Sequence, residues 1–184
     1  MMKPAFSIFQ TERLLLRPVE ASDQELVFTG LSDPEVTKFL LIHYPTWEAS
    51  NLQMDYYRTQ RESGQGFYWV MDDPRTQCGM GVIGFNKIST EHQRTEIGFW
   101  ILPAFQRKGF VREAAHALIQ DAFLNQDFIR IEASAETGNV ASCSTLLSLG
   151  FRPEGIYRSY EWNRGHRIDL EWFGLLRDEW QQEG

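Results

Sequence analysis

The stretch RTEIGFWILPAFQRKGFVREAAHALIQDAFLNQ, residues 94–126, decides the fold of this chain. Apolar side chains alternate with other residues from Thr95 to Leu102, as in a β-strand, and Pro103 ends the pattern. The turn QRKGFV (106–111) follows, and apolar residues then recur at helical spacing from Val111 to Phe123. The stretch therefore predicts a strand, a tight turn and an amphipathic helix.

The turn puts backbone N–H groups and two cationic side chains, Arg107 and Lys108, at the start of that helix. A helix N-terminus carries unsatisfied N–H donors and a partial positive charge, which suit a phosphate or pyrophosphate. A side chain at Gly109 would block a close approach to the backbone. We therefore expect this element to bind a phosphorylated cofactor.

Length and composition describe an ordinary globular protein. With 184 residues, 42% hydrophobic and 23% charged, the chain is long enough for one domain, residues 1–184, and short for two. The formal net charge of −7 disfavours a general nucleic-acid binder, because non-specific affinity for phosphate backbones comes from Lys and Arg. An acidic surface can attract a cationic substrate or simply keep the protein soluble.

The two cysteines, Cys78 and Cys143, are too few for a disulfide framework. They also lack the C-x-x-C spacing of a metal or redox pair, so no metal site is expected and a reducing cytoplasm is the simplest setting. The chain opens without a charged and then apolar leader, and apolar runs such as 39–42 are too short to cross a bilayer. We therefore expect neither a membrane protein nor a secreted one.

The sequence GMGVIG, residues 79–84, matches the G-x-G-x-x-G pattern of dinucleotide-binding folds. That pattern must follow a strand and open a helix. Here VIGFNKI continues as strand-forming sequence, so the glycines indicate a bent or bulged strand.

The remaining segments alternate between helix and strand signals. Asn139 can cap one helix, and Gly150 can end it. We expect strands at 11–19, 129–135, 152–162 and 168–176, a hairpin at 67–88, a helix from a capping box at 22–25 to Gly30, and helices starting at Asp33-Pro34, at Thr46 (to Ser63) and at Asn139.

In this order the segments resemble the GNAT superfamily of acetyl-CoA-dependent N-acetyltransferases, and within it the ribosomal-protein N-terminal acetyltransferases. The resemblance covers nearly the whole chain and implies an α/β (α+β) fold, with a central mixed, mostly antiparallel seven-stranded sheet flanked by about four to five helices. Its motifs are TERLLLR (11–17), EIGFWI (96–101), QRKGFV with REA (106–114), NVAS through LGF (139–151), Asp169 and RDEW (177–180).

In that family, backbone amides of the turn bind the pyrophosphate of acetyl-CoA. Gln106 and Gly109 match the family pattern Q/R-x-x-G-x-G/A, whereas Val111 replaces its last small residue, and there we most expect a departure. For Arg107 and Lys108, a solvated turn is an equally good explanation. The resemblance assigns the cofactor to Gln106, Arg107, Lys108, Gly109, Phe110, Val111, Asn139 and Ser142.

The implied reaction is direct attack of a neutral amine on an acetyl thioester, without an acyl-enzyme. Amines are mostly protonated in water, with a pKa of about 10.4 for lysine, so a base or a water chain must remove a proton. Glu96 matches the position of the family's catalytic glutamate and would act through water; the alternative is a strand carboxylate with a local partner. The backbone N–H near Ile101 or Leu102 would hold the thioester carbonyl.

The tyrosine that usually protonates the leaving thiolate is absent, since Leu146 occupies its position. Ser142 matches a serine that the ribosomal-protein branch uses near the cofactor sulfur, and we expect it to relay a proton. Asn139 would contact the pantetheine arm or the sulfur region, although capping alone explains it too. Cys143 is not expected to be a nucleophile.

The acceptor groove is expected between the loop at 40–47 and the hairpin turn at 162–166, with Tyr44 and Trp162 as contacts. Hydrophobic packing explains both residues equally well.

The acceptor would be a protein N-terminal α-amino group or a small amine such as a polyamine, an amino acid or an aminoglycoside. The alternative function is a non-catalytic acyl-CoA sensor of the same fold. The resemblance implies a monomer or homodimer.

Overall fold

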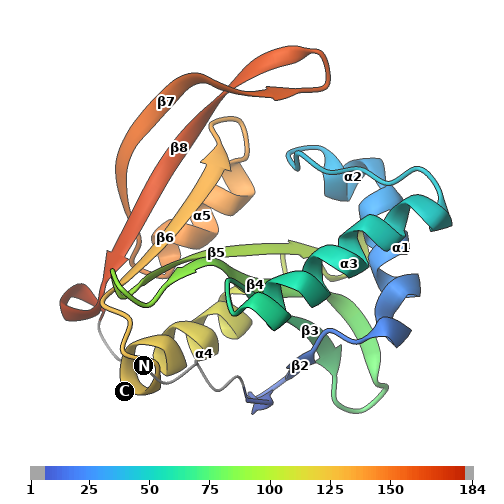
Figure 1. Ribbon diagram of the computed structural model, residues 1–184, viewed down its shortest axis with the longest axis horizontal. Coiled ribbons are helices and arrows are strands. Elements are labelled where there is room, and N and C mark those ends of the chain that lie inside the picture. Colours follow the sequence, from blue (N-terminus) through green and yellow to red (C-terminus); the bar gives the residue numbers. More distant parts are fainter. Residues whose placement is uncertain (1–6, 181–184) are drawn as a thin grey trace.

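One mixed β-sheet organises the protein. In the computed structural model, which describes residues 7–180, the strands lie in the order β1-β2-β3-β4-β5-β6-β8-β7 (Figure 1). Neighbouring strands are antiparallel except β5 and β6, which are parallel. The strands are β1 (Phe9–Gln10), β2 (Leu15–Pro18), β3 (Phe67–Asp73), β4 (Cys78–Ser89), β5 (Arg94–Ile101), β6 (Arg130–Glu136), β7 (Arg152–Asn163) and β8 (His166–Leu176).

The predicted mixed, mostly antiparallel fold is confirmed. The sheet has eight strands rather than seven, because the two-residue strand β1 adds to the edge beside β2. Five α-helices in the described part of the chain accompany it, in line with the expected four to five. They are α1 (Gln24–Ser32), α2 (Pro34–Thr37), α3 (Trp47–Ser63), α4 (Phe110–Asn125) and α5 (Val140–Ser148).

Several local signals act as the sequence predicts. The Thr46 side chain accepts the Ala49 N–H at the start of α3, and Gly64 ends that helix with a φ of +72°. The glycines at 79–84 lie inside β4 and do not open a helix. At Gly81 a Cβ atom would stand 2.3 Å from the carbonyl oxygen of Trp100, so close strand packing explains this glycine.

The capping box predicted at 22–25 is wrong. A short 3-10 turn, Ala21–Asp23, precedes α1, and the Asp23 carboxylate accepts the backbone N–H of Glu20 at 2.8 Å. The same carboxylate also receives two hydrogen bonds from Arg17, at 2.7 and 2.9 Å. Because this charged partner lies on β2, tertiary structure favours a capping box between Glu20 and Asp23 at the 3-10 turn. The helix α1 then runs past the predicted end at Gly30 to Ser32.

The sheet opens between β5 and β6. These strands pair only at their beginnings, with Arg94, Thr95 and Glu96 beside residues 130–132. Beyond this point β5 continues along β4 and β6 continues along β8, so the two strands diverge (Figure 1). This gap in the middle of the sheet positions the site described below.

The two faces of the sheet are covered differently. The larger apolar cluster packs α4 and α5 on one face, and it includes Ile97, Leu118 and Leu146. A smaller cluster packs α1 and α3 on the other face, around Tyr57 and Trp100. Side chains of β5 alternate between these clusters, as its sequence predicts.

Candidate functional site

The start of α4 is open toward solvent. Gly109 is the N-cap residue, with a φ of +81°, and has no side chain that could bind the first N–H groups of the helix. The first hydrogen bond of the helix runs from Glu113 N–H to the Gly109 carbonyl at 3.0 Å, so the N–H groups of Phe110 and Val111 precede any helical acceptor. In contrast, Thr46 and Asn139 side chains cap α3 and α5. An anion bound at the start of α4 would accept hydrogen bonds from these N–H groups.

The turn before α4 is held by the N-terminal segment, which the sequence reasoning did not foresee. Glu113 accepts hydrogen bonds from the Thr11 hydroxyl (2.6 Å), the Arg13 N–H (2.8 Å) and the Arg13 guanidinium (2.6 Å). Arg13 also donates to the Lys108 carbonyl at 2.9 Å and lies over the Phe110 ring. The segment 11–13 therefore fixes both the turn and the first turn of α4.

These contacts set the charge state of Glu113. Burial alone would raise the pKa of this carboxyl group, but hydrogen bonds from Thr11 and Arg13, together with the charge of Arg13, lower it below the usual value. The carboxylate is thus ionised at neutral pH while it holds the turn.

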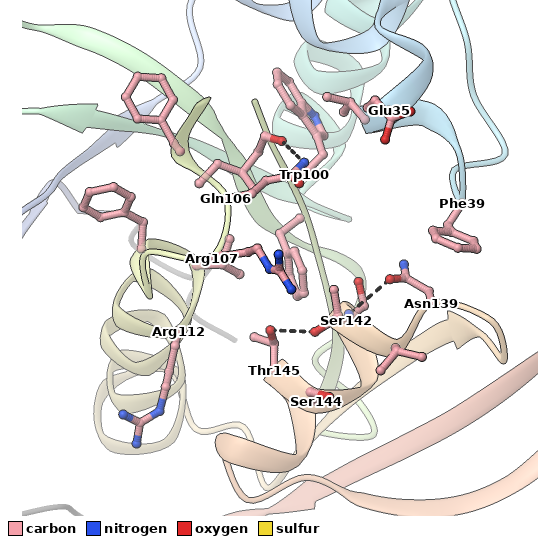
Figure 2. A pocket seen from close by; sticks show the side chains of 18 of the residues that line it. Glu35, Phe39, Trp100, Gln106, Arg107, Arg112, Asn139, Ser142, Ser144 and Thr145 are labelled. Carbon is pink, nitrogen blue, oxygen red and sulfur yellow. Dashed lines mark hydrogen bonds between the residues drawn. The ribbon is translucent and has the colours of Figure 1, made fainter. Parts of the chain in front are cut away.

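A large cleft of about 660 Å³ lies between the starts of α4 and α5. In Figure 2 the Arg107 side chain extends into it toward α5, while Glu35 and Phe39 border it from the side of α2. Eight of the predicted cofactor residues line this cleft: Ile101, Gln106, Arg107, Gly109, Phe110, Val111, Asn139 and Ser142.

Two predicted cofactor residues do not reach the cleft. The Lys108 ammonium group donates to the Ala104 carbonyl at 2.7 Å, which directs it away. The Leu102 N–H is bonded to the Met80 carbonyl at 2.9 Å, and the Leu102 side chain packs on the α1–α3 face. The expectation that Leu102 N–H holds a thioester carbonyl is therefore wrong, because that group completes the β4–β5 ladder.

The other residues of β5 present backbone groups to the gap in the sheet. Because hydrogen bonding alternates along an antiparallel ladder, the pairing of Leu102 with Met80 turns the N–H and C=O groups of Phe99 and Ile101 toward the opposite edge. Gln106 donates its side-chain amide to the Ile101 carbonyl at 3.2 Å and so ties the turn to this edge (Figure 2).

The start of α5 forms the opposite wall. The Asn139 side chain accepts the Ser142 N–H at 3.1 Å, so the predicted cap is confirmed, and both residues line the cleft (Figure 2). Leu146, which replaces the family's tyrosine, is 2% exposed and packs in the core. Burial raises the pKa of the Cys143 thiol, and the charge of Glu171 raises it further, so this thiol stays protonated.

Glu96 lies beside the gap but lines neither cavity. Its side chain shares a face of β5 with Gly98 and Trp100, is 12% exposed, and accepts a hydrogen bond from Lys87 at 2.7 Å. Lys87 is therefore the local partner of the alternative explanation, in which Glu96 is a strand carboxylate with a structural role. A reactive role for this carboxylate requires a bridging water.

An aromatic pocket of about 420 Å³ opens on the α1–α3 face. It meets the large cleft at Leu40, Phe99 and Trp100, which line both cavities. Tyr44, the predicted acceptor contact, lines this pocket, and its role stays a prediction. The other aromatic residues were missed, although the pair Tyr56-Tyr57 on α3 was an available signal. The lining residues are Leu40, Ile42, Tyr44, Leu52, Gln53, Tyr56, Tyr57, Tyr68, Val82, Gly98, Phe99 and Trp100.

The structure does not bring Trp162 to either cavity. Its side chain is 61% exposed and lies against the Arg167 guanidinium, 5.3 Å from the ring centre. The neighbouring Arg164 donates to the Thr37 carbonyl (2.9 Å) and hydroxyl (3.0 Å). The hairpin turn therefore touches the end of α2, as a groove wall would, while Trp162 points elsewhere.

The described part of the chain also bears on two other kinds of site. Among residues 7–180, no helix is both long enough and apolar enough to span a membrane. Over the same residues, no group of three His, Cys, Asp or Glu side chains is arranged to hold a metal ion.

Sequence comparison identifies the class of protein. The acetyltransferase (GNAT) domain family matches residues 13–152. The chain therefore belongs to the GNAT acetyltransferases, as its motifs predict, and it is an enzyme of that class. A Bacillus licheniformis protein named uncharacterized N-acetyltransferase p20 is 36% identical over 172 residues, covering 92% of this chain and 96% of the relative.

Solved structures share the fold. Ribosomal-protein-S5-alanine acetyltransferase from Vibrio fischeri superposes with a TM-score of 0.82 at 21% identity, covering 96% of this chain and 100% of the other. Spermidine N-acetyltransferase from Vibrio cholerae, solved with CoA and spermine, gives a TM-score of 0.81 at 18% identity, covering 92% and 98%.

Proposed function

We propose that this protein transfers an acetyl group from acetyl-CoA to a primary amine, either a protein N-terminal α-amino group or a small amine. One observation carries the proposal: the large cleft at the open start of α4 meets the aromatic pocket at Phe99 and Trp100, where β5 leaves β6. A donor and an acceptor that enter from the two sides of the sheet would meet at this point.

The large cleft suits acetyl-CoA, which supplies an activated acetyl thioester when bound. The pyrophosphate would lie on the N–H groups of Phe110 and Val111, with the Arg107 guanidinium nearby. Val111 is larger than the small residue that is usual at this position, but its side chain packs partly against the core. Its backbone N–H would therefore still donate to the pyrophosphate. The pantetheine arm would follow the β5 edge at Phe99 and Ile101.

Three groups would perform the chemistry. Glu96 would remove a proton from the amine through a water molecule, and the Ile101 N–H would donate a hydrogen bond to the thioester carbonyl. The Ser142 hydroxyl would relay a proton to the departing thiolate, because Leu146 cannot. The amine would attack directly, since the Cys143 thiol is protonated and no acyl-enzyme is needed.

Release of free CoA thiol tests the proposal directly. The purified protein is incubated with acetyl-CoA and a panel of peptides with varied N-terminal residues, polyamines, amino acids and aminoglycosides. We expect thiol release that depends on at least one acceptor. A matched reaction without acceptor measures hydrolysis, and mass spectrometry of the acceptor verifies a gain of one acetyl group.

The alternative, an acyl-CoA sensor, gives a different result. A sensor would bind CoA, detected as a rise in melting temperature, without acceptor-dependent thiol release from any member of the panel. That combination would overturn the proposed transferase activity for these acceptors and leave cofactor binding intact.

A further inference from the structure

The aromatic pocket offers an acceptor very little charge. None of its lining residues among the described part of the chain is Asp, Glu, Lys or Arg. The nearest carboxylate on the same strand face, Glu96, is already paired with Lys87 at 2.7 Å. A second ammonium group on an acceptor would therefore lose its hydration without gaining an ionic partner, which is costly.

The polar atoms of the pocket wall bind one another. The Tyr44 hydroxyl donates to the Gln53 side-chain carbonyl at 3.1 Å, and the Trp100 indole N–H donates to the Tyr57 hydroxyl at 3.2 Å. The Tyr68 hydroxyl donates to that of Tyr56 at 3.1 Å. With these hydroxyl groups engaged in the wall, the surface that remains for a ligand is mainly aromatic carbon.

The tyrosines also stay uncharged. Burial raises the pKa of Tyr57 and Tyr68, and for Tyr68 the hydrogen bond with Tyr56 and the charge of Glu96 raise it further. Neutral phenols give a cationic substituent no ionic partner, so only the weaker attraction of the ring faces would offset its loss of hydration. Such a wall favours the burial of an apolar group.

Gly98 forms an open floor under this wall. A Cβ atom on Gly98 would meet only the Asn86 side-chain nitrogen, at 3.7 Å, which is an ordinary contact. At the neighbouring Gly84, which pairs with Gly98 across the sheet, a Cβ would stand 2.4 Å from the Tyr68 ring. Space is thus filled over Gly84 and left empty over Gly98.

We propose that the acceptor is a primary amine carried on an apolar group, aromatic or branched aliphatic, and that this group occupies the aromatic pocket over Gly98. Gly98 then limits the size of the group, and the pocket selects against polyamines and against acidic or strongly polar substituents. The inference rests on the proposed acetyl transfer and narrows its acceptor. Two kinds of acceptor have a primary amine on an apolar group: a peptide whose first residue is apolar, and a free apolar amine.

Two pairs of acceptors test the inference and distinguish these sources. One pair consists of peptides that differ only in their first residue, phenylalanine or aspartate. The other consists of the free amines 2-phenylethylamine and spermidine. In whichever pair is acetylated, we expect kcat/KM for the apolar member to exceed that for the polar member by about 10-fold or more. Apolar pockets commonly discriminate between substrates by this factor.

Substitution at Gly98 tests its role. Gly98→Leu should lower kcat/KM for the apolar acceptor at least about 10-fold, and Gly98→Ala roughly 3-fold, while the KM for acetyl-CoA stays unchanged. Thr59→Leu adds the same side chain at an exposed site of α3 outside the pocket and should change neither parameter. If Gly98→Leu does not fold, Gly98→Ala tests the role of Gly98 instead. Its added methyl group makes only an ordinary van der Waals contact, so this variant is expected to fold.

Each outcome has a definite meaning. Equal or better use of spermidine or of the aspartyl peptide, or unchanged apolar-acceptor kinetics in folded Gly98 variants, overturns the apolar-acceptor inference but leaves acetyl transfer standing. Thiol release with other amines but none of these four also overturns it. Absence of acceptor-dependent release across the whole panel overturns both proposals.

Discussion

The large cleft and the aromatic pocket adjoin at Phe99 and Trp100 but differ in what their polar groups do. In the cleft, the first N–H groups of α4 have no helical acceptor, and Arg107 extends into the space (Figure 2). In the pocket, hydroxyl, indole and amide groups bond to one another. The comparison teaches that the chemistry a cavity offers depends on its residue types and also on whether its polar groups are already bonded to one another.

The largest effect is expected at the junction of the two cavities. Glu96→Gln should lower kcat about 100-fold or more, because the variant cannot take up the proton of the amine. Steady-state rates measure this effect, and Glu91→Gln, in an exposed turn, serves as the control. An unchanged rate would assign Glu96 only the structural pairing with Lys87.

A change in the turn should affect the cleft and spare the pocket. Gly109 has a φ of +81°, where a residue with a side chain costs about 1–2 kcal/mol. Gly109→Val should therefore raise the KM for acetyl-CoA about 10-fold and leave the ranking of acceptors unchanged. Gly64→Val places the same strain at the end of α3, and it should lower stability without altering that KM. A changed acceptor ranking in Gly109→Val would contradict the separation of the two cavities.

A smaller effect is expected from the wall formed by α5. Ser142→Ala removes one hydroxyl, worth about 1 kcal/mol, so kcat should fall roughly 5-fold with little change in the KM for either substrate. The Asn139 cap bonds the backbone N–H of Ser142 and is therefore preserved. Ser148→Ala, at the other end of the helix, is the control. A silent Ser142→Ala would give the proton relay to a water molecule.

The smallest effect concerns the segment that holds the turn. The pKa of Glu113 is lower in the folded protein than in the unfolded chain, so as pH falls the unfolded state takes up this proton first. The stabilisation is therefore complete above the unfolded pKa of about 4.3 and is lost as pH falls through the folded pKa.

Glu113→Gln should accordingly lower the melting temperature by about 2–4 °C at pH 7, corresponding to roughly 1 kcal/mol, and by less near pH 3.5. Thermal melts at the two pH values measure the difference. Asp55→Asn breaks an ion pair in which both side chains are largely exposed, and it should change little at either pH. An equal loss for Glu113→Gln at both pH values would show that its charge does not hold the turn.

The sequence predicted elements well where local signals are strong. The β5–turn–α4 unit, the Asn139 cap and the assignment of 79–84 to a strand all follow from short-range patterns, and the structure confirms them. Most of the predicted cofactor residues line one cleft because they are adjacent in that unit or at a helix start. Their roles in binding and catalysis remain predictions.

The sequence failed where a distant partner decides the outcome. Arg17 binds Asp23, which forms the capping box with Glu20, and the Met80 carbonyl accepts the Leu102 N–H. The contacts of Thr11 and Arg13 with Glu113 join residues about a hundred positions apart. A local sequence pattern cannot predict contacts over such a separation.

By itself, the sequence determined the family, the order of most strands and helices, and the glycine-containing turn at the start of α4, because these depend on spacing and on residues next to one another. Only the tertiary structure decided that β5 parts from β6 after Glu96, and that tyrosines from α3 and β3 close into a wall beside Trp100. The physical reason is that hydrogen bonds within a wall remove polar groups from a ligand's reach, and such pairing depends on which side chains meet in space.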